Sequence, residues 1–257
     1  MVSLTTLGLM INNDLRNDWD SVVSVTGMEG VAKSTFAIQL CAKIDKYFRL
    51  KNNITYRYDN LVDKVYGLPK YAAIMADEMG LIAFSREAMT KANRDLVKAL
   101  MVCRDQNKAL VLCIPNFWFL DSYVRNHRTT YWIHLPQIEI KGNRIRGFAE
   151  VRRKKENRWG NEPYWQKLGV IRFDRLPEEI EKIYKEQKRE AILKEIAESM
   201  IENDLNPRDK MIVEWAKDGK TDSMIAEMLP TSFKCTRENI GQRRRALMDR
   251  KEGSPLS

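Results

Sequence analysis

The segment at residues 27–35 constrains this chain more than any other stretch of its sequence. It reads Gly27-Met28-Glu29-Gly30-Val31-Ala32-Lys33-Ser34-Thr35. A short β-branched run, Ser21–Thr26, precedes the segment and is typical of a buried strand. Apolar residues at helical spacing follow it, from Phe36 to Phe48. A strand, a glycine-containing loop and a helix in this order predict a loop that binds the phosphates of a nucleotide.

The residue types in this loop match the chemistry of phosphate binding. Lys33 is expected to offer a cation to the β- and γ-phosphates of ATP, and Ser34 an oxygen ligand to Mg²⁺. All nine residues are predicted to surround the phosphates, largely through backbone N–H groups. Ala32 stands where the consensus has its second glycine. If the loop needs a positive φ there, alanine costs on the order of 1 kcal/mol.

A second motif follows a later apolar strand. Residues 71–76 are apolar and end in Asp77-Glu78. Asp77 is predicted to hold Mg²⁺, and Glu78 to polarise the attacking water as general base. A simple turn at the end of a strand is the alternative interpretation.

Further catalytic candidates lie on both sides of the third apolar strand, residues 109–114. Asn116 follows this strand after a proline and could sense the γ-phosphate or the water, although an ordinary turn asparagine explains it equally well. Three arginines near predicted element ends are candidates for a group that reaches a neighbouring subunit's nucleotide, with solvated arginines as the alternative. They are Arg104, Arg125 and Arg128.

Strands alternate with helices through the first half of the chain, which predicts an α/β fold with a mostly parallel sheet. Residues 1–20 carry Asn and Asp turn signals and are predicted to be a lead-in. From residue 137 the alternation indicates an antiparallel hairpin, and Pro177 opens a long charged helix. The expected parts are an ATPase domain at 1–185 with a hairpin insertion at about 137–168, a connecting helix at 186–206, and a small all-α domain at 207–257.

The distribution of charge indicates a polyanionic partner. The formal net charge is +9. Residues 141–175 contain eleven basic and four acidic residues, and residues 231–251 contain seven and two. Such clusters are typical of nucleic-acid binders, with a merely solvated basic surface as the alternative. The chain has two histidines and four cysteines without a CxxC pair, which excludes a His-rich metal centre and favours buried free thiols.

Residues 208–251 have the pattern of a DNA-binding helix-turn-helix. A first helix is predicted at 221–229, followed by a longer turn than usual and a recognition helix capped by Thr236. Side chains of this helix that suit base edges or phosphates are Arg237, Asn239, Gln242, Arg243, Arg244 and Arg245. A small basic helical bundle for subunit contacts is the alternative.

Taken together, these motifs resemble one family. The loop, the Asp77-Glu78 pair and the stretches 85–87, 102–104, 112–116 and 127–128 are similar to P-loop ATPases encoded by phages, archaeal viruses and plasmids. These are grouped with the zonular-occludens-toxin-like and FtsK/HerA-like ATPases of the RecA-type division. The similarity covers roughly residues 20–185, including Arg146-Gly147 and residues 173–177. It implies a RecA-like fold and ATP hydrolysis coupled to work on DNA. Membrane-anchored relatives carry a transmembrane segment, and no such segment is visible in this sequence.

The leading hypothesis is a DNA-associated ATPase of a mobile genetic element, serving translocation, packaging, replication or partition. ATP and Mg²⁺ are the expected cofactors, and duplex DNA and further copies of the chain the expected partners. One alternative is an ATP-switched transcriptional regulator with slow hydrolysis, and another is a signalling ATPase whose C-terminal segment binds protein. No run approaches the roughly 18 apolar residues of a membrane span, and the N-terminus lacks the pattern of a secretory signal. We therefore expect no membrane partner and a cytoplasmic location, in the host cell if the protein is viral.

Overall fold

The chain forms two compact units in a computed structural model, Met1–Gln187 and Lys188–Ser257. The structure describes residues 2–57, 60–77, 86–160, 162–204, 207–217, 219–229 and 237–252. The first unit is α/β, as predicted, and the described part of the second is helical. Each unit is considered by itself below.

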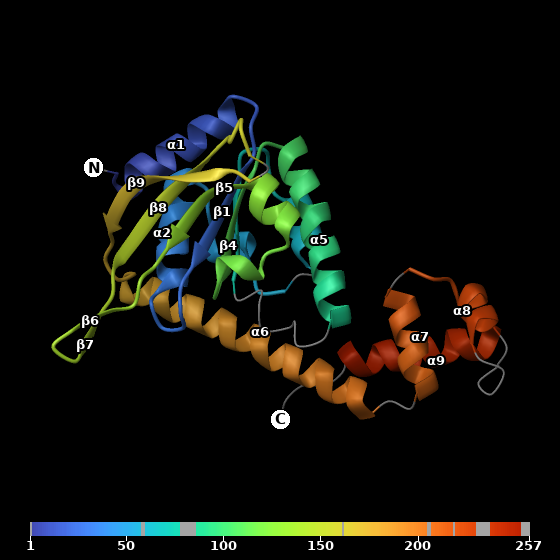
Figure 1. The fold of residues 1–257 in the computed structure, drawn as a ribbon. Helices are drawn as coiled ribbons and strands as arrows, with labels where there is room; N and C mark the ends of the chain where they lie inside the picture. Colours follow the sequence, from blue (N-terminus) through green and yellow to red (C-terminus); the bar gives the residue numbers. More distant parts are fainter. Residues whose placement is uncertain are drawn as a thin grey trace. The chain divides into compact units, whose positions relative to one another are not determined.

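A seven-stranded sheet forms the centre of the first unit (Figure 1), with the strand order β2-β3-β4-β1-β5-β8-β9. The strands are β1 (Ser21–Thr26), β2 (Ile54–Thr55), β3 (Ala73–Ala76), β4 (Ala109–Ile114), β5 (Thr129–His134), β8 (Phe148–Lys155) and β9 (Tyr164–Arg172). Neighbours from β2 to β5 are parallel, and β8 and β9 add antiparallel pairs. The predicted mostly parallel sheet is therefore confirmed.

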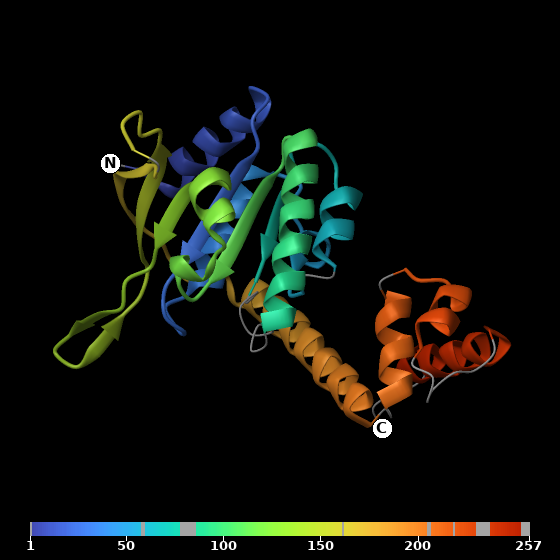
Figure 2. The ribbon, with the colours of Figure 1, turned by 45° about the vertical axis from the view of Figure 1, so that its right-hand side comes forward.

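Helices cover both faces of this sheet (Figures 1 and 2). They are α1 (Leu4–Arg16), α2 (Lys33–Ile44), α3 (Leu50–Asn53), α4 (Leu61–Gly67) and α5 (Arg86–Asp105), with the short turns η1 (Phe117–Phe119) and η2 (Val124–Arg128). Alternate residues of each strand face opposite sides, so Val23 packs with α1 and α2 whereas Val22 packs with α4 and α5. Both faces of β1 and β4 are fully buried for this reason, and β4 is apolar throughout.

Most of the predicted lead-in at residues 1–20 is the helix α1, which its turn signals did not indicate. Ser3 caps this helix by accepting a hydrogen bond from the Thr6 N–H. Three residues, Leu7, Ile11 and Leu15, follow at four-residue spacing and are fully buried. The Asn and Asp residues that indicated turns lie between them on the same helix. Tertiary burial of one apolar stripe outweighs the local turn preference of these residues.

The predicted hairpin insertion is present, but in two parts. A separate two-stranded sheet pairs β6 (Ile138–Ile140) with β7 (Asn143–Ile145), and it projects from the unit in both views of the ribbon (Figures 1 and 2). Gly147, at φ 96°, ends this hairpin before β8 begins. Strand β9 starts at Tyr164 and pairs antiparallel along β8.

The helix that Pro177 opens is α6 (Glu178–Asp204), and its described continuation is α7 (Pro207–Lys217), α8 (Asp222–Met228) and α9 (Arg237–Glu252). A small apolar core holds the last three together, with Ile212, Ile225 and Ile240 fully buried. The turn between α8 and α9 lies outside the described residues, so the helix-turn-helix arrangement stays a prediction.

Three cysteines in the described part of the chain, Cys41, Cys103 and Cys113, are buried free thiols, as predicted. Burial raises the pKa of Cys41, and it raises the pKa of Cys103 to about 12, so both stay protonated at neutral pH. Cys235 lies outside the described residues. Over the described ranges, every helix is too short or too polar to span a bilayer.

Candidate nucleotide site

Gly27 begins the loop directly after β1, at a position where the structure admits only glycine. Its φ is 147°, and a Cβ on it would lie 2.5 Å from the carbonyl oxygen of Leu135. Its N–H donates to the carbonyl of Pro115 at 3.2 Å, which ties the loop to the end of β4. The first glycine of the motif is therefore required by the close packing of three neighbouring strand ends.

Ala32 adopts the left-handed conformation immediately before α2, with φ 74° and ψ 36°. Gly30, two residues earlier, also has a positive φ of 79°. These two positions turn the chain so that the first helical residue is Lys33. A left-handed alanine costs about 1 kcal/mol relative to glycine, which is the strain that the sequence predicted for a positive φ here.

The ammonium group of Lys33 lies over the loop. Its Nζ donates to the carbonyl oxygens of Gly27 and Met28, at 2.8 and 3.0 Å. The amine is held beside the first turn of α2, where backbone N–H groups have no helical partners. A cation next to a helix N-terminus is the arrangement that attracts a phosphate group.

Ser34 and Asp77 lie in contact although 43 residues separate them. The reason is that β3 ends at the same edge of the sheet at which the loop begins. The Ser34 hydroxyl donates to Oδ1 of Asp77 at 3.0 Å, and the Asp77 side chain is fully buried. A hydroxyl and a carboxylate are oxygen ligands of the kind that Mg²⁺ takes from a protein, with phosphates and waters as the other ligands. Over the described ranges no group of three or more His, Cys, Asp or Glu side chains gathers.

Two tyrosines stand beside the Asp77 carboxylate. The hydroxyl of Tyr184, on α6, donates to Oδ2 of Asp77. The Tyr56 ring lies 6.4 Å from the Tyr184 ring, and its buried hydroxyl has no partner among the described residues. Burial, followed by the charge of Asp77, raises the pKa of both phenols far above the ordinary value. Both therefore remain protonated donors, and the donor capacity of the buried Tyr56 hydroxyl is unused among the described residues.

The contacts described above involve neither of the other two predicted catalytic residues, Glu78 and Asn116. Glu78 lies outside the described residues. Asn116 is exposed at the end of β4, and its side-chain oxygen accepts a hydrogen bond from the Trp118 N–H at 3.0 Å. The side chain therefore caps η1, while its amide N–H₂ group takes no part in that bond.

The three candidate arginines all have contacts inside their own unit. Arg104 donates to the carbonyl of Asp18, and Arg128 pairs with Asp20. Because Asp18 and Asp20 precede β1, these two lie at the opposite edge of the sheet from the loop. Arg125 stacks over Trp118 at 4.8 Å and donates to the carbonyl of Leu120. None of the three reaches the loop of its own chain, and action on a neighbouring subunit stays a prediction.

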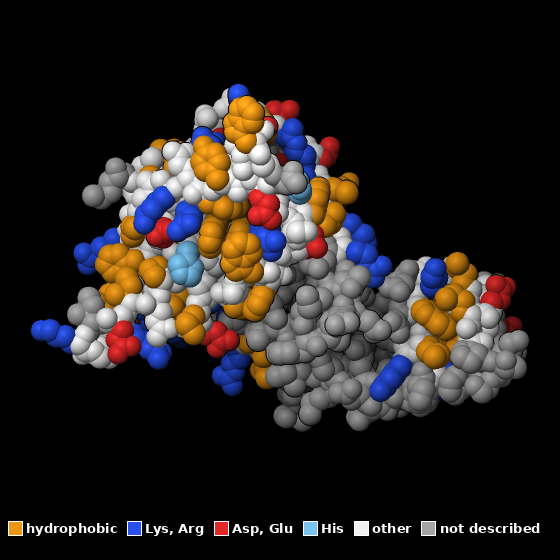
Figure 3. Space-filling view, in the orientation of Figure 1, with side chains coloured by type: hydrophobic (Ala, Val, Ile, Leu, Met, Phe, Trp, Pro, Cys, Tyr) orange, Lys and Arg blue, Asp and Glu red, His pale blue; other side chains and the backbone are white. Residues whose placement is uncertain are grey.

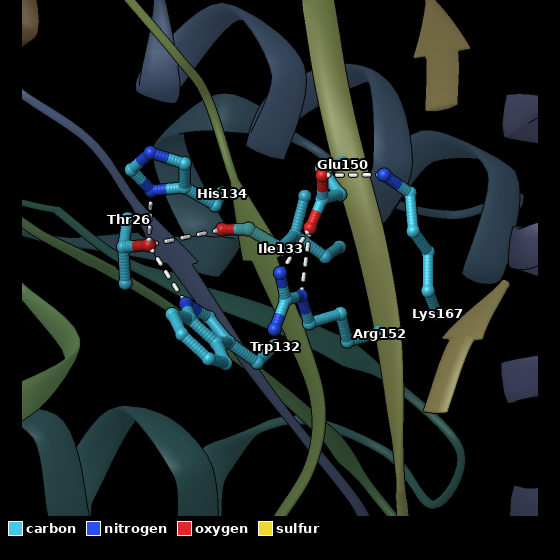
Figure 4. A network of polar contacts seen from close by, with 7 residues as sticks. All are labelled: Thr26, Trp132, Ile133, His134, Glu150, Arg152 and Lys167. Atoms are coloured by element: carbon cyan, nitrogen blue, oxygen red, sulfur yellow. Dashed lines mark hydrogen bonds and ion pairs between the residues drawn. The ribbon is translucent and has the colours of Figure 1, made fainter. Parts of the chain in front are cut away.

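Thr26, the residue before the loop, is held by a polar network that leads away across β5 and β8 (Figure 4). Its hydroxyl accepts from the Trp132 indole N–H at 2.9 Å and lies 3.2 Å from Nδ1 of His134. Arg152 lies over the Trp132 ring, and Glu150 accepts hydrogen bonds from Arg152 and Lys167. The last residue of β1 is thereby anchored on the side of β5.

Sequence reasoning missed a cavity of about 520 Å³ that opens onto the loop. Ala32 and Thr35 form one wall, and three arginines line the rest together with residues 173–176. These arginines are Arg144, Arg146 and Arg175. The positive charge of residues 141–175 was the signal that could have drawn attention to them. Tyr184 had no such signal, because nothing in its helical neighbourhood marks a contact with Asp77.

In the second unit, two predicted DNA-binding arginines are used for internal ion pairs. Arg243 forms a two-pronged pair with the buried carboxylate of Asp209, with Nη2 at 2.6 Å, and Arg244 pairs with Asp222 at 3.0 Å. Three others, Asn239, Gln242 and Arg245, are exposed. The side chain of Arg237 lies outside the described residues.

No model of a known protein family matches this sequence, and a comparison with curated proteins finds none that is significantly similar.

Proposed function

We propose that this chain is an ATP-hydrolysing P-loop enzyme of the RecA-type division that acts on DNA. The observation that carries the proposal is the contact between Ser34 and Asp77, at 3.0 Å, beside the Lys33 amine. A chance glycine-rich turn would have no reason to bring a hydroxyl and a buried carboxylate from distant segments together at the first turn of a helix.

The order of the strands supports the assignment to the RecA-type division. One strand, β4, stands between β1, which leads into the loop, and β3, which ends at Asp77. Asn116 follows this intervening strand, so it lies at the edge of the sheet between the loop and Asp77. This is the place from which a polar side chain could sense the terminal phosphate of a bound nucleotide.

Each residue then has a distinct task in hydrolysis. Lys33 and the N-terminal N–H groups of α2 bind the β- and γ-phosphates. Ser34 and Asp77 hold Mg²⁺, which neutralises phosphate charge when it is bound. Glu78 accepts a proton from the attacking water as general base, and Asn116 orients that water or the γ-phosphate.

DNA is the proposed partner on which ATP hydrolysis acts, because positive charge is concentrated in two segments. Figure 3 shows Lys and Arg side chains interspersed with hydrophobic ones on one face of the first unit. In the second unit, α8 and α9 would form a helix-turn-helix, with Gln242 and Arg245 available to the nucleic acid. The resemblance to ATPases of phages, archaeal viruses and plasmids makes a mobile genetic element the proposed setting.

The rate of ATP hydrolysis with and without duplex DNA tests this function. We expect Lys33→Ala to abolish nucleotide binding and Glu78→Gln to trap bound ATP. Because charge dominates binding, the affinity for duplex DNA should fall steeply with added salt. Turnover that continues in Lys33→Ala would refute the ATPase, and DNA binding that does not respond to salt would refute the DNA assignment.

The internal ion pairs of Arg243 and Arg244 favour one second candidate, in which the C-terminal helices are a bundle that binds protein. Deletion of residues 206–257 separates the two. Loss of DNA binding with retained oligomer size supports the DNA assignment, whereas retained DNA binding with a smaller oligomer supports the bundle.

A further inference from the structure

A cluster of arginines lies beside the loop but outside the motifs that define the proposed site. Arg144 and Arg146 come from the β6–β7 hairpin and its end, and Arg175 from the segment after β9. All three line the cavity of about 520 Å³, and Ala32 and Thr35 form the wall of this cavity on the side of the loop. Arg146 lies close to the loop, because its Nη2 is 3.8 Å from where a Cβ on Gly30 would stand.

The cavity is built to keep these arginines in place. The Phe173 ring packs edge-on against Phe36 of α2 at 5.1 Å, and Gln39 of α2 donates to the carbonyl of Asp174 at 2.7 Å. The Phe173 N–H donates to the Gly147 carbonyl at 2.9 Å. At Gly147, moreover, a Cβ would lie 2.6 Å from the Phe173 carbonyl oxygen. The base of the hairpin is therefore fastened to the segment that forms the cavity floor, and that floor to the loop helix.

The three guanidinium groups are only partly compensated, since Arg175 interacts electrostatically with Glu181, which lines the same cavity. None of them forms a hydrogen bond or ion pair with any residue that the structure describes. Two carboxylates also line or approach the cavity, Asp174 and Glu181, but Glu181 pairs with Lys185 at 2.6 Å. Three like charges around one hollow repel one another, so an anionic ligand would stabilise the arrangement.

We infer that this cavity holds the nucleoside end and the inner phosphates of the nucleotide, and that Arg146 binds the phosphate chain in cis. The inference rests on the proposed function, because it takes the terminal phosphates to lie at Lys33 and Ser34. From there the rest of the nucleotide leaves the loop past Thr35, where the cavity begins. Arg144 and Arg175 flank the nucleoside, whose base can stack on a guanidinium plane. Lys33 of the loop supplies one cation to the phosphates, and Arg146 at the end of the hairpin supplies a second.

The first test measures equilibrium binding of Mg·ATP and of inorganic tripolyphosphate to the full chain. Arg146→Ala should weaken both ligands about 10- to 100-fold, because a charged hydrogen bond to phosphate is lost. Arg146→Lys should bind with an affinity between those of Arg146→Ala and the unmodified protein. Lysine keeps the positive charge but loses the planar, two-pronged donor geometry of the guanidinium group. Arg144→Ala and Arg175→Ala should weaken ATP more than tripolyphosphate, which has no nucleoside.

Arg158→Ala is the matched control, because Arg158 is an exposed arginine in the turn between β8 and β9. If Arg146→Ala binds both ligands as tightly as Arg158→Ala does, the cavity inference is overturned. Lys33→Ala keeps that failure separate from failure of the ATPase proposal. If Lys33→Ala loses ligand binding while Arg146→Ala keeps it, only the cavity inference is refuted. If Lys33→Ala itself keeps ligand binding, the proposed function is refuted.

The second test distinguishes action in cis from action on a neighbour. Lys33→Ala and Arg146→Ala chains are mixed, and ATP hydrolysis is measured. An arginine that acts in cis leaves the mixture no more active than the mean of the two variants measured separately. Recovered activity would mean that Arg146 of one chain serves the nucleotide of another, and would overturn the assignment in cis.

Discussion

The hydroxyl of Tyr184 donates a hydrogen bond to the buried carboxylate of Asp77, 107 residues earlier in the chain. Ser34 donates to the other oxygen of the same carboxylate at 3.0 Å. The carboxylate is thus oriented from two sides, by the loop helix and by α6. A carboxylate that holds a metal generally depends on such outer hydrogen bonds for its orientation.

Tyr184→Phe should weaken the response of the enzyme to Mg²⁺. Without the hydroxyl, Asp77 loses one of the donors that fix its orientation, and we expect the Mg²⁺ concentration for half-maximal ATP hydrolysis to rise by roughly tenfold. The free energy of unfolding should fall by about 1–3 kcal/mol, because a buried acceptor is left with fewer partners. A Mg²⁺ titration and urea unfolding measure the two effects. Tyr164→Phe, on the exposed part of β9, serves as control, and an identical Mg²⁺ response in both variants would contradict the positioning role.

Ala32→Gly should stabilise the protein. The left-handed φ of 74° strains alanine but not glycine, so the free energy of unfolding should rise by up to about 1 kcal/mol. Ala37→Gly, inside α2 and buried, should instead lower it by about that amount or more. Chemical denaturation of the two variants checks both signs. A loss of stability in Ala32→Gly would show that the loop does not hold this conformation in solution.

Glu150 should contribute to stability only above acidic pH. Its hydrogen bond from Lys167, and next that from Arg152, lower the pKa of Glu150 below the ordinary 4.5 in the folded state. The contribution is therefore complete above pH 4.5 and is lost as the pH falls through the folded pKa. We expect Glu150→Gln to cost at most about 1 kcal/mol at neutral pH, because the group is partly exposed. Urea unfolding of both proteins across this range should show the difference shrinking in acid, and a difference independent of pH would argue against the ion pairs.

The arginines of α9 should separate into structural and DNA-binding residues. Arg243→Ala removes a two-pronged partner of the buried Asp209 carboxylate and should speed hydrogen exchange in α7 and α9. Arg245→Ala should leave that exchange unchanged and weaken DNA binding by about threefold to tenfold. Exchange and DNA binding are measured on the full chain. The opposite pattern, with Arg245 protecting the helices and Arg243 affecting only DNA, would refute this division.

The strands and the loop could be predicted because their information is local. Residues 109–114 are an uninterrupted apolar run, residues 21–26 are short and rich in β-branched valine and threonine, and the loop combines residue types that only phosphate binding requires together. The contacts of Tyr184 and Arg146 depend instead on how α6 and a projecting hairpin pack against the sheet. Residues 1–20 show the same limit, since Asn and Asp mark turns in isolation but are tolerated in a helix whose other face is buried.

The β6–β7 hairpin shares no ladder with the seven-stranded sheet within the described residues, and each of its strands has only three residues. A two-stranded hairpin of this size is marginally stable by itself in water. A nucleotide that contacts Arg144 and Arg146 would therefore help to stabilise the folded hairpin. Binding would then carry the thermodynamic signature of ordering, with a large favourable enthalpy offset by entropy, and a protease that cuts the hairpin in the empty protein would be slowed by ATP.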